Sequence, residues 1–349
     1  MYIENINSPK DIKKLSVEQL SVLAEEVRTA LIRKLSEHGG HIGPNLGMVE
    51  TTIALHYVFN SPIDKIVFDV SHQSYVHKML TGRMAAFLDP AKYDDVTGYT
   101  NPDESEHDFF TIGHTSTSVS LAMGLAKGRD LTGGKENIIA VIGDGSLSGG
   151  EALEGLNNAA MLGSNMIIIV NDNDQSIAEN HGGLYKGLKE LRDTNGESPD
   201  NIFKAMGLEY YYLGDGHDVS ALIKLFTSVK DIDRAVVLHI HTIKGKGLKY
   251  AEENKEYWHA GGPFHIEDGS PKGPGWPVNE TVRESVLDLI EKRSDVVAIT
   301  AGTPSVIGFT EDYRKRAGKQ FVDVGIAEEH AVAMASGIAR NGGTPIFGV

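Results

Sequence analysis

The chain has 349 residues with a globular balance of 40% apolar and 23% charged side chains, which is more than one hydrophobic core usually organises and predicts about two domains. Its formal net charge of −15 disfavours nucleic acid and anionic membranes as partners, and its lack of cysteine excludes disulfides, thiolate nucleophiles and cysteine-based metal sites. Because the longest apolar runs are far below the roughly 20 residues of a membrane span and the polar start is no signal peptide, we expect a cytoplasmic protein.

Helices and buried-type strands are predicted to alternate through the first 259 residues. Ser16 to Gln19 forms a capping-box pattern at the start of a long amphipathic helix. Strands at 138–142 and 166–170, separated by a helix at 150–162, predict a right-handed parallel unit. We therefore expect an α/β fold with a doubly wound parallel sheet. The other expected elements are helices at 47–58, 116–127 and 219–229 and strands at 66–70, 210–213 and 235–241.

A glycine- and proline-rich stretch separates this first domain from a second one. Residues 260–278 read as a linker between a first domain at 1–259 and a second at 279–349. Because the chain stops inside the last expected strand, we expect the second domain to be the incomplete N-terminal part of an α/β domain. Its expected elements are helices at 282–292 and 327–340 and strands at 296–300, 321–325 and from 345.

Two polar segments follow neighbouring strands of the predicted sheet. Gly143-Asp144-Gly145-Ser146 comes after the strand at 138–142, and Asn171-Asp172-Asn173 ends the next strand. Since open α/β sheets bind ligands at the carboxyl ends of their strands, these segments predict a site for Mg²⁺ and a diphosphate. Asp144, the amide oxygen of Asn173 and the backbone carbonyl of Gln175 are the predicted metal ligands. Gly143 and Gly145 would let the diphosphate approach the main chain.

Other nucleotide motifs fit this sequence less well. A dinucleotide fingerprint would need glycine at the sixth position from Gly143, where Ser148 stands. This alternative is weakened but remains open. A Walker motif is absent, because Gly245-Lys246 is followed by Gly247.

The Gly-Asp-Gly and Asn-Asp-Asn pair resembles the thiamine diphosphate motif of the transketolase superfamily. Further motifs, in the same order along the chain, resemble the 1-deoxy-D-xylulose-5-phosphate synthase family, and the resemblance runs over nearly the whole chain. These motifs are Gly39-Gly40-His41, the run from Asp69 to Lys78, Thr81-Gly82-Arg83, Gly113 to Ser118, Asp215 to Asp218, Lys244 to Gly247 and Asp323 to Val332.

The resemblance implies particular roles for several side chains. Glu328 would pair with N1′ of the cofactor's aminopyrimidine, and His41 and His72 would relay protons near the reacting oxygens. His259, after Trp258, would close the site. The residues implied to bind the cofactor are His72, Gly113, His114, Thr115, Ser116, Gly143, Asp144, Gly145, Ser146, Asn173, Lys244 and Glu328.

The implied activity is the thiamine diphosphate- and Mg²⁺-dependent condensation of pyruvate with D-glyceraldehyde 3-phosphate to 1-deoxy-D-xylulose 5-phosphate and CO₂. This reaction serves isoprenoid-precursor and thiamine biosynthesis, and the family is homodimeric. A ketol-transferring transketolase and a non-catalytic cofactor-binding fragment remain as alternatives.

Two departures from the family's pattern are visible. The segment from Ile177 to Gly214 is much shorter than the family's insertion at this place, and the family's C-terminal part is missing. The shorter segment bears on which acceptor fits. The missing part holds the family's ligands of the acceptor phosphate.

Overall fold

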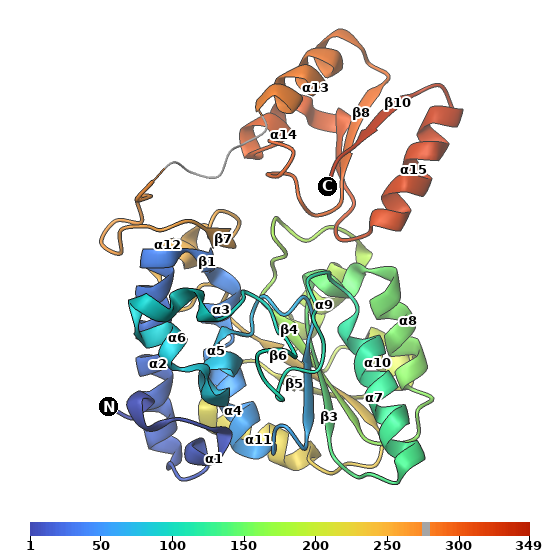
Figure 1. Cartoon of the computed structure of the whole chain (residues 1–349). Coiled ribbons are helices and arrows are strands. Elements are labelled where there is room, and N and C mark those ends of the chain that lie inside the picture. Colours follow the sequence, from blue (N-terminus) through green and yellow to red (C-terminus); the bar gives the residue numbers. More distant parts are fainter. Residues whose placement is uncertain (274–279) are drawn as a thin grey trace.

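Two parallel sheets organise the chain, whose computed structural model describes residues 1–273 and 280–349 (Figure 1). The five-stranded sheet has the order β2-β3-β4-β6-β5, and the three-stranded sheet has the order β10-β8-β9. Parallel pairing with helices on both faces confirms the predicted α/β class. The strands are β2 (Lys65–Phe68), β3 (Ile138–Gly143), β4 (Met166–Asp172), β5 (Glu209–Leu213), β6 (Ala235–His241), β8 (Val296–Thr300), β9 (Phe321–Asp323) and β10 (Thr344–Phe347).

Alternate residues of the central strands face two different helical layers. In β3, Ile138, Ala140 and Ile142 pack in one core cluster, and Ile139 and Val141 pack in another. All five are fully buried, as strands covered on both faces must be. The first layer contains α7 (Ser118–Thr132), α8 (Gly150–Ala159), α9 (Gly183–Asp193) and α10 (Ile202–Ala205), and the second contains α4 (Val49–Val58) and α11 (Val219–Val229).

A third cluster lies around α2 (Val17–His38), which opens with the predicted capping box. The Gln19 amide donates to Ser16 Oγ at 3.3 Å, and the Ser16 amide donates to Gln19 Oε1 at 2.8 Å. The elements near α2 are mostly single turns. They include η1 (Ile3–Asn5), α1 (Pro9–Ile12), α3 (Gly43–Gly47), α5 (Tyr75–Lys78), η2 (Met79–Arg83), α6 (Ala85–Leu88), η3 (Pro90–Asp95) and α12 (Lys249–Glu253).

The three-stranded sheet has α13 (Glu280–Lys292) and α14 (Glu311–Ala317) on one side and α15 (Glu328–Arg340) on the other (Figure 1). Val286, Leu287 and Ile290 of α13 form its core with Val296 and Ala298 of β8. The predicted helix at 282–292 and strand at 296–300 are confirmed to within two residues. A short η5 (Gly318–Gln320) leads into β9.

Two predicted boundaries are wrong for a backbone reason. β2 ends at Phe68 rather than at residue 70, because Val70 and Ser71 take φ values of 57° and 68°. α7 starts at Ser118 rather than at residue 116, because Ser116 has φ 75°. Left-handed backbone ends both regular elements. The helices α9 and α10, inside the shortened segment, were not predicted.

The predicted linker is not free of structure at its start. Strand β7 (Ala260–Gly261) pairs with β1 (Gly40–His41), and Phe264 is buried in the core around α2. These contacts attach the start of the stretch to the part of the chain that carries the five-stranded sheet. Residues 274–279, which hold the end of the predicted linker and the predicted start of the second domain, lie outside the described residues. The division into domains stays a prediction.

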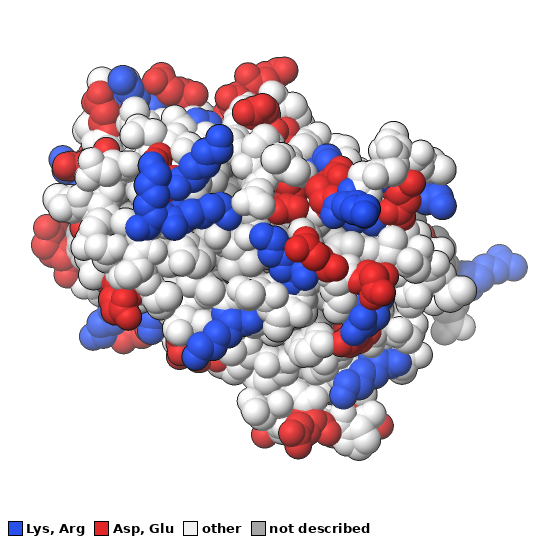
Figure 2. Space-filling view, turned by 90° about the horizontal axis from the view of Figure 1, so that it is seen from below, with Lys and Arg blue, Asp and Glu red and all other residues white. Residues whose placement is uncertain are grey.

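Figure 2 shows the charged side chains on one face of the molecule. On this face, lysine and arginine form one small patch and are otherwise interspersed with aspartate and glutamate. Among residues 1–273 and 280–349, no helix has both the length and the apolar character needed to cross a bilayer.

Phe226 tests the packing that supports the sheet. It is fully buried on α11, and its ring centroid lies 6.2 Å from that of Phe59. We expect Phe226→Ala to lower the free energy of unfolding by about 3–5 kcal/mol, because it removes buried apolar surface and leaves a cavity. Urea denaturation measures this change. The adjacent exposed Thr227→Ala is the control, and an equal effect of both variants would contradict the assigned core.

Candidate active site

The carboxyl ends of β3 and β4 bring the two predicted polar segments together. Gly143 pairs with Asn171 in the parallel register, and the next amide, of Asp144, donates to the Asn171 carbonyl oxygen at 3.0 Å. The turn η4 (Gly145–Ser148) follows directly. The hydrogen-bond ladder therefore places Asp144 beside the end of β4, as the sequence predicts.

Asp144 is a buried carboxylate with two hydrogen-bond donors on one oxygen. Its side-chain Oδ2 accepts from the Gln175 amide at 3.0 Å and from Asn180 Nδ2 at 2.8 Å. Burial raises its pKa above the ordinary aspartate value, and the nearby Asp172 carboxylate acts in the same direction. A positive charge at this position would favour the ionised form.

The residues present fit a cation that arrives with a diphosphate. Asn173 Oδ1 is buried and accepts no hydrogen bond, so an amide oxygen is free for a hard cation. Within the described residues, no group of three or more His, Cys, Asp or Glu side chains could hold a metal ion by itself. Asp144 would then be the one carboxylate ligand, and the other ligands would be neutral protein oxygens, phosphate oxygens and water. This ligand set is typical of Mg²⁺ bound with a phosphate compound.

Open space beside the glycines supports the same interpretation. A Cβ atom added at Gly143 or Gly113 would meet no atom within 4 Å. By contrast, a Cβ at Gly145 would come within 2.8 Å of Ser176 Oγ. Gly143 and Gly113 therefore border room for a ligand, whereas Gly145 is needed for the close approach of the loop after β4.

The segment from Gly113 to Ser116 is only partly free to bind a ligand. The Asp69 carboxylate accepts the Ser116 amide at 2.8 Å and the Ser118 amide at 2.9 Å. Ser116 Oγ donates to the Ser146 carbonyl oxygen at 2.8 Å. Ser116 is thus hydrogen-bonded to Ser146, and Asp69 already caps the start of α7. His114 and Thr115 keep side chains that are accessible to a ligand.

Three histidines predicted to be near the reaction meet in one cluster. The ring centroids of His41 and His72 are 5.1 Å apart, and that of His259 lies 5.3 Å from His72 and 5.9 Å from His41. Burial lowers the pKa of His41 to about 4 and holds the pKa values of His72 and His259 well below the ordinary value. The Nδ1 atoms of His41 and His72 are buried without a hydrogen-bond partner. The cluster is therefore neutral near pH 7 and has polar atoms to offer.

Lys244 is buried beside this cluster rather than solvated. Its Nζ donates to the Ser176 carbonyl oxygen and lies 3.1 Å from His259 Nδ1. Burial lowers the pKa of Lys244 to about 7. The preceding backbone is fixed by the Ile243 amide, which donates to His217 Nε2 at 2.8 Å.

Glu328 reaches the same region from the three-stranded sheet. It begins α15, at the strand-to-helix turn that the sequence predicts. Glu328 Oε1 lies 3.8 Å from His114 Nε2, and the turn is held by Ser148 Oγ, which donates to the Ile326 carbonyl oxygen at 3.0 Å. The structure thus brings Glu328 and His114 together although they are far apart in sequence.

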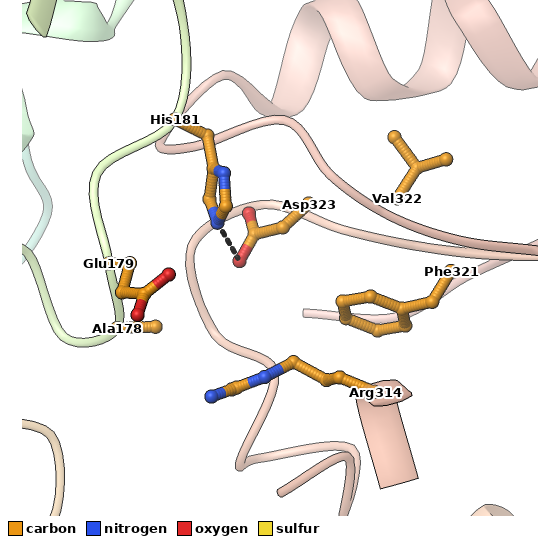
Figure 3. Close-up of a pocket in the computed structure, with 7 residues that line it drawn as sticks. All are labelled: Ala178, Glu179, His181, Arg314, Phe321, Val322 and Asp323. Atoms are coloured by element: carbon orange, nitrogen blue, oxygen red, sulfur yellow. Dashed lines mark ion pairs between the residues drawn. The ribbon is translucent and has the colours of Figure 1, made fainter. Parts of the chain in front are cut away.

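A cavity of about 410 Å³ lies next to this turn. Figure 3 shows the His181 ring pointing toward the Asp323 carboxylate, with Nε2 and Oδ2 3.9 Å apart. Arg314 on α14 forms a bidentate ion pair with Glu256, with both contacts at 3.0 Å. The lining residues are Ala178, Glu179, His181, Arg314, Phe321, Val322 and Asp323.

The structure also distinguishes two histidines that belong to the same sequence motif. His77, from the same motif as His72, is buried outside the cluster. Its Nδ1 lies 2.9 Å from His56 Nε2, and its Nε2 lies 2.9 Å from Asp108 Oδ1. Asn180 and Tyr185 contact Asp144 or its turn, and neither was predicted. Both lie beyond the Asn-Asp-Asn segment, in a stretch with no local pattern that signals a ligand contact.

Comparisons with known proteins give one consistent family. A family model described as 1-deoxy-D-xylulose-5-phosphate synthase matches residues 3–198 and 193–242. Proteins named 1-deoxy-D-xylulose-5-phosphate synthase from Carboxydothermus hydrogenoformans and Chlorobaculum tepidum are each 40% identical over 99% of this chain. The chain spans 62% and 61% of their respective lengths.

Solved structures agree on the fold. A transketolase from Campylobacter jejuni matches with a TM-score of 0.57 and 17% identity, over 95% of this chain and 65% of that one. A transketolase from Leishmania mexicana gives 0.54 and 16%, over 96% and 64%. At these identities the likeness concerns the fold alone.

The buried histidines predict a dependence of stability on pH. An unfolded imidazole takes up a proton near pH 6.5, whereas burial delays protonation of His41 to about pH 4. Acidification from pH 6.5 toward 4 therefore favours the unfolded chain and lowers the free energy of unfolding. We expect His41→Asn to make this decrease smaller, by up to about 3 kcal/mol. Urea unfolding at several pH values measures this, with the exposed His265→Asn as control. An unchanged pH dependence in His41→Asn would contradict the conclusion that His41 is buried and neutral.

Proposed function

Because the chain belongs to the 1-deoxy-D-xylulose-5-phosphate synthase family, we propose that the complete protein condenses pyruvate with D-glyceraldehyde 3-phosphate to 1-deoxy-D-xylulose 5-phosphate and CO₂, with thiamine diphosphate and Mg²⁺. One observation carries the proposal beyond family membership. Glu328 Oε1, at the start of α15, lies 3.8 Å from His114 Nε2, in the loop before α7. The glycine turn after β3 lies at the same junction, where Ser148 Oγ donates to the backbone before Glu328. A cofactor with a diphosphate at one end and a basic ring at the other can contact both.

The diphosphate end would be held at the five-stranded sheet. Asp144, Asn173 and the Gln175 carbonyl oxygen would bind the cation, which offsets the diphosphate charge. The glycines at 113 and 143 would allow close approach, with Gly145, His114, Thr115, Ser116 and Ser146 along the same edge. Lys244 and His72 would complete the contacts from the histidine side.

The reactive end would be controlled by Glu328. When bound, thiamine diphosphate supplies a carbon nucleophile and an electron sink that no amino-acid side chain provides. Glu328 would hold a charge-assisted hydrogen bond at the aminopyrimidine N1′.

The neutral histidines suit proton movement at substrate oxygens. His41 and His72 have unpartnered ring nitrogens in a buried cluster, so either ring can donate or accept one proton without first losing a charge. His259 lies against both rings and against Lys244. These side chains would orient the two substrates and exclude water.

We also propose that the complete protein is a cytoplasmic homodimer, since the family is dimeric. The other enzyme reading, ketol transfer, differs in its donor. Parallel assays of the complete protein with pyruvate and with a ketose phosphate separate the two reactions. Cofactor binding without turnover of either donor would favour a non-catalytic role.

Asp144→Ala tests the cation site. We expect it to abolish Mg²⁺-dependent binding of thiamine diphosphate, because it removes the one carboxylate ligand and leaves the diphosphate charge uncompensated. Isothermal titration calorimetry with and without Mg²⁺ measures the binding. Asp174→Ala is the matched control, because this side chain is 58% exposed and pairs with Arg192. An unchanged affinity in Asp144→Ala would contradict the metal assignment.

Glu328→Gln separates binding from chemistry. The diphosphate contacts lie on the other sheet, so we expect cofactor affinity to fall only modestly. Hydrogen–deuterium exchange at the cofactor's C2 should slow by about 10²- to 10⁴-fold or more, because glutamine cannot hold the charge-assisted hydrogen bond. Exchange is compared at saturating cofactor, with the neighbouring Glu329→Gln as control. Exchange at the native rate in Glu328→Gln would show that its carboxylate has no role at the reacting carbon.

A further inference from the structure

Asn180 contacts the proposed cation site from a position that neither the motif nor the family resemblance assigns. Its Nδ2 donates to Asp144 Oδ2 at 2.8 Å. Its other side-chain atom, Oδ1, is buried and has no hydrogen-bond partner. A buried amide that uses its donor and leaves its acceptor unpaired carries a desolvation cost.

A second unpaired amide oxygen is present in the same segment after β4. This atom, Asn173 Oδ1, is also buried without a partner. In an octahedral Mg²⁺ site, oxygen ligands at about 2.1 Å from the ion are about 3 Å from each other. Because the Asn180 amide already touches Asp144, its oxygen lies within the reach that such a site requires.

We propose that Asn180 is a further ligand of the cation, through Oδ1, and that its hydrogen bond to Asp144 is the resting arrangement of the same side chain. This inference rests on the proposed function, since it needs the Mg²⁺ and diphosphate site. Rotation about the terminal side-chain torsion, which is broad for asparagine, exchanges the amide nitrogen for the oxygen. Asp144 then loses one N–H donor and gains the cation in its place.

Contacts on both sides of Asn180 attach this segment to the rest of the fold. On one side, the Gln175 amide donates to Asp144 at 3.0 Å, and the Ser176 carbonyl oxygen accepts from Lys244 Nζ. On the other side, His181 lies 3.9 Å from Asp323. The amide group of Asn180 still has an unpaired oxygen in this segment.

The test compares two variants that remove different atoms. Asn180→Ala removes both the donor and the oxygen, whereas Asn180→Asp keeps an oxygen ligand and loses the donor. Mg²⁺ is titrated calorimetrically into the complete protein at saturating thiamine diphosphate. We expect the Kd for Mg²⁺ to rise about tenfold in Asn180→Ala and to stay equal or fall in Asn180→Asp. Asn158→Ala, an exposed asparagine that bonds to the Glu154 carbonyl oxygen at 2.8 Å, is the control.

A second measurement counts ligands directly. With Mn²⁺ in place of Mg²⁺ and ¹⁷O-labelled water, pulsed electron paramagnetic resonance should show one more water on the ion in Asn180→Ala than in the wild type, and none more in Asn180→Asp. An unchanged water count in Asn180→Ala would overturn the inference. Equal loss of Mg²⁺ affinity in both variants would also overturn it, because the N–H donor would then be the group that matters.

The wild type separates this failure from that of the proposed function. Absence of Mg²⁺-dependent cofactor binding in the wild type would refute the proposed function itself. Normal binding in the wild type and in both Asn180 variants would refute the Asn180 ligand alone.

Discussion

The hydrogen-bond ladder between β3 and β4 is the constraint on which the site depends. Five residues of β3 pair in parallel with β4, from Ile139 opposite Ile167 to Gly143 opposite Asn171. Parallel strands end at the same edge, so two chemically suited segments 29 positions apart become neighbours without any contact between their side chains. A shift of register by one residue would exchange the side chains that face the two core layers. The cores on the two sides of the sheet therefore fix the position of Asp144 as firmly as its own hydrogen bonds do.

Burial of polar side chains is the second property that the fold gives the site. The interior of the site holds neutral imidazoles and a lysine whose pKa is lowered by burial to about 7. In such surroundings an added charge or dipole acts strongly, because little water screens it. Among residues 1–273 and 280–349, no protein group bonds to the Nδ1 atoms of His41 and His72.

The sequence predicted the elements and motifs whose signals are local. The capping box at Ser16, the buried strands and the strand-to-helix turn before Glu328 all depend on neighbouring residues, and the structure has each of them. Membership of the family also followed from motifs in order. Short turns such as α5 and α12 escaped prediction, because four or five residues show no clear period.

The rest of the site depends on contacts that no sequence window contains. The meeting of His259 with His41, the position of Asn180 on Asp144 and the approach of His114 to Glu328 each join residues that lie more than 30 positions apart in the chain. The left-handed Ser116 is another example, because its conformation is fixed by Asp69 from a different strand end. Tertiary packing decides such positions, and residue type alone does not.

The segment between β4 and α9 contacts both sheets at once. Asn180 bonds to Asp144 on one side, and the His181 carbonyl oxygen lies so close to Gly325 that an added Cβ there would be 3.1 Å from it. Any ligand that moves this segment therefore acts on the three-stranded sheet as well. Thermodynamic coupling is reciprocal: if contact with that sheet changes the binding free energy of a ligand, the bound ligand changes the free energy of that contact by the same amount. Residues 180 and 181 therefore link Asp144 to Gly325 through two direct contacts.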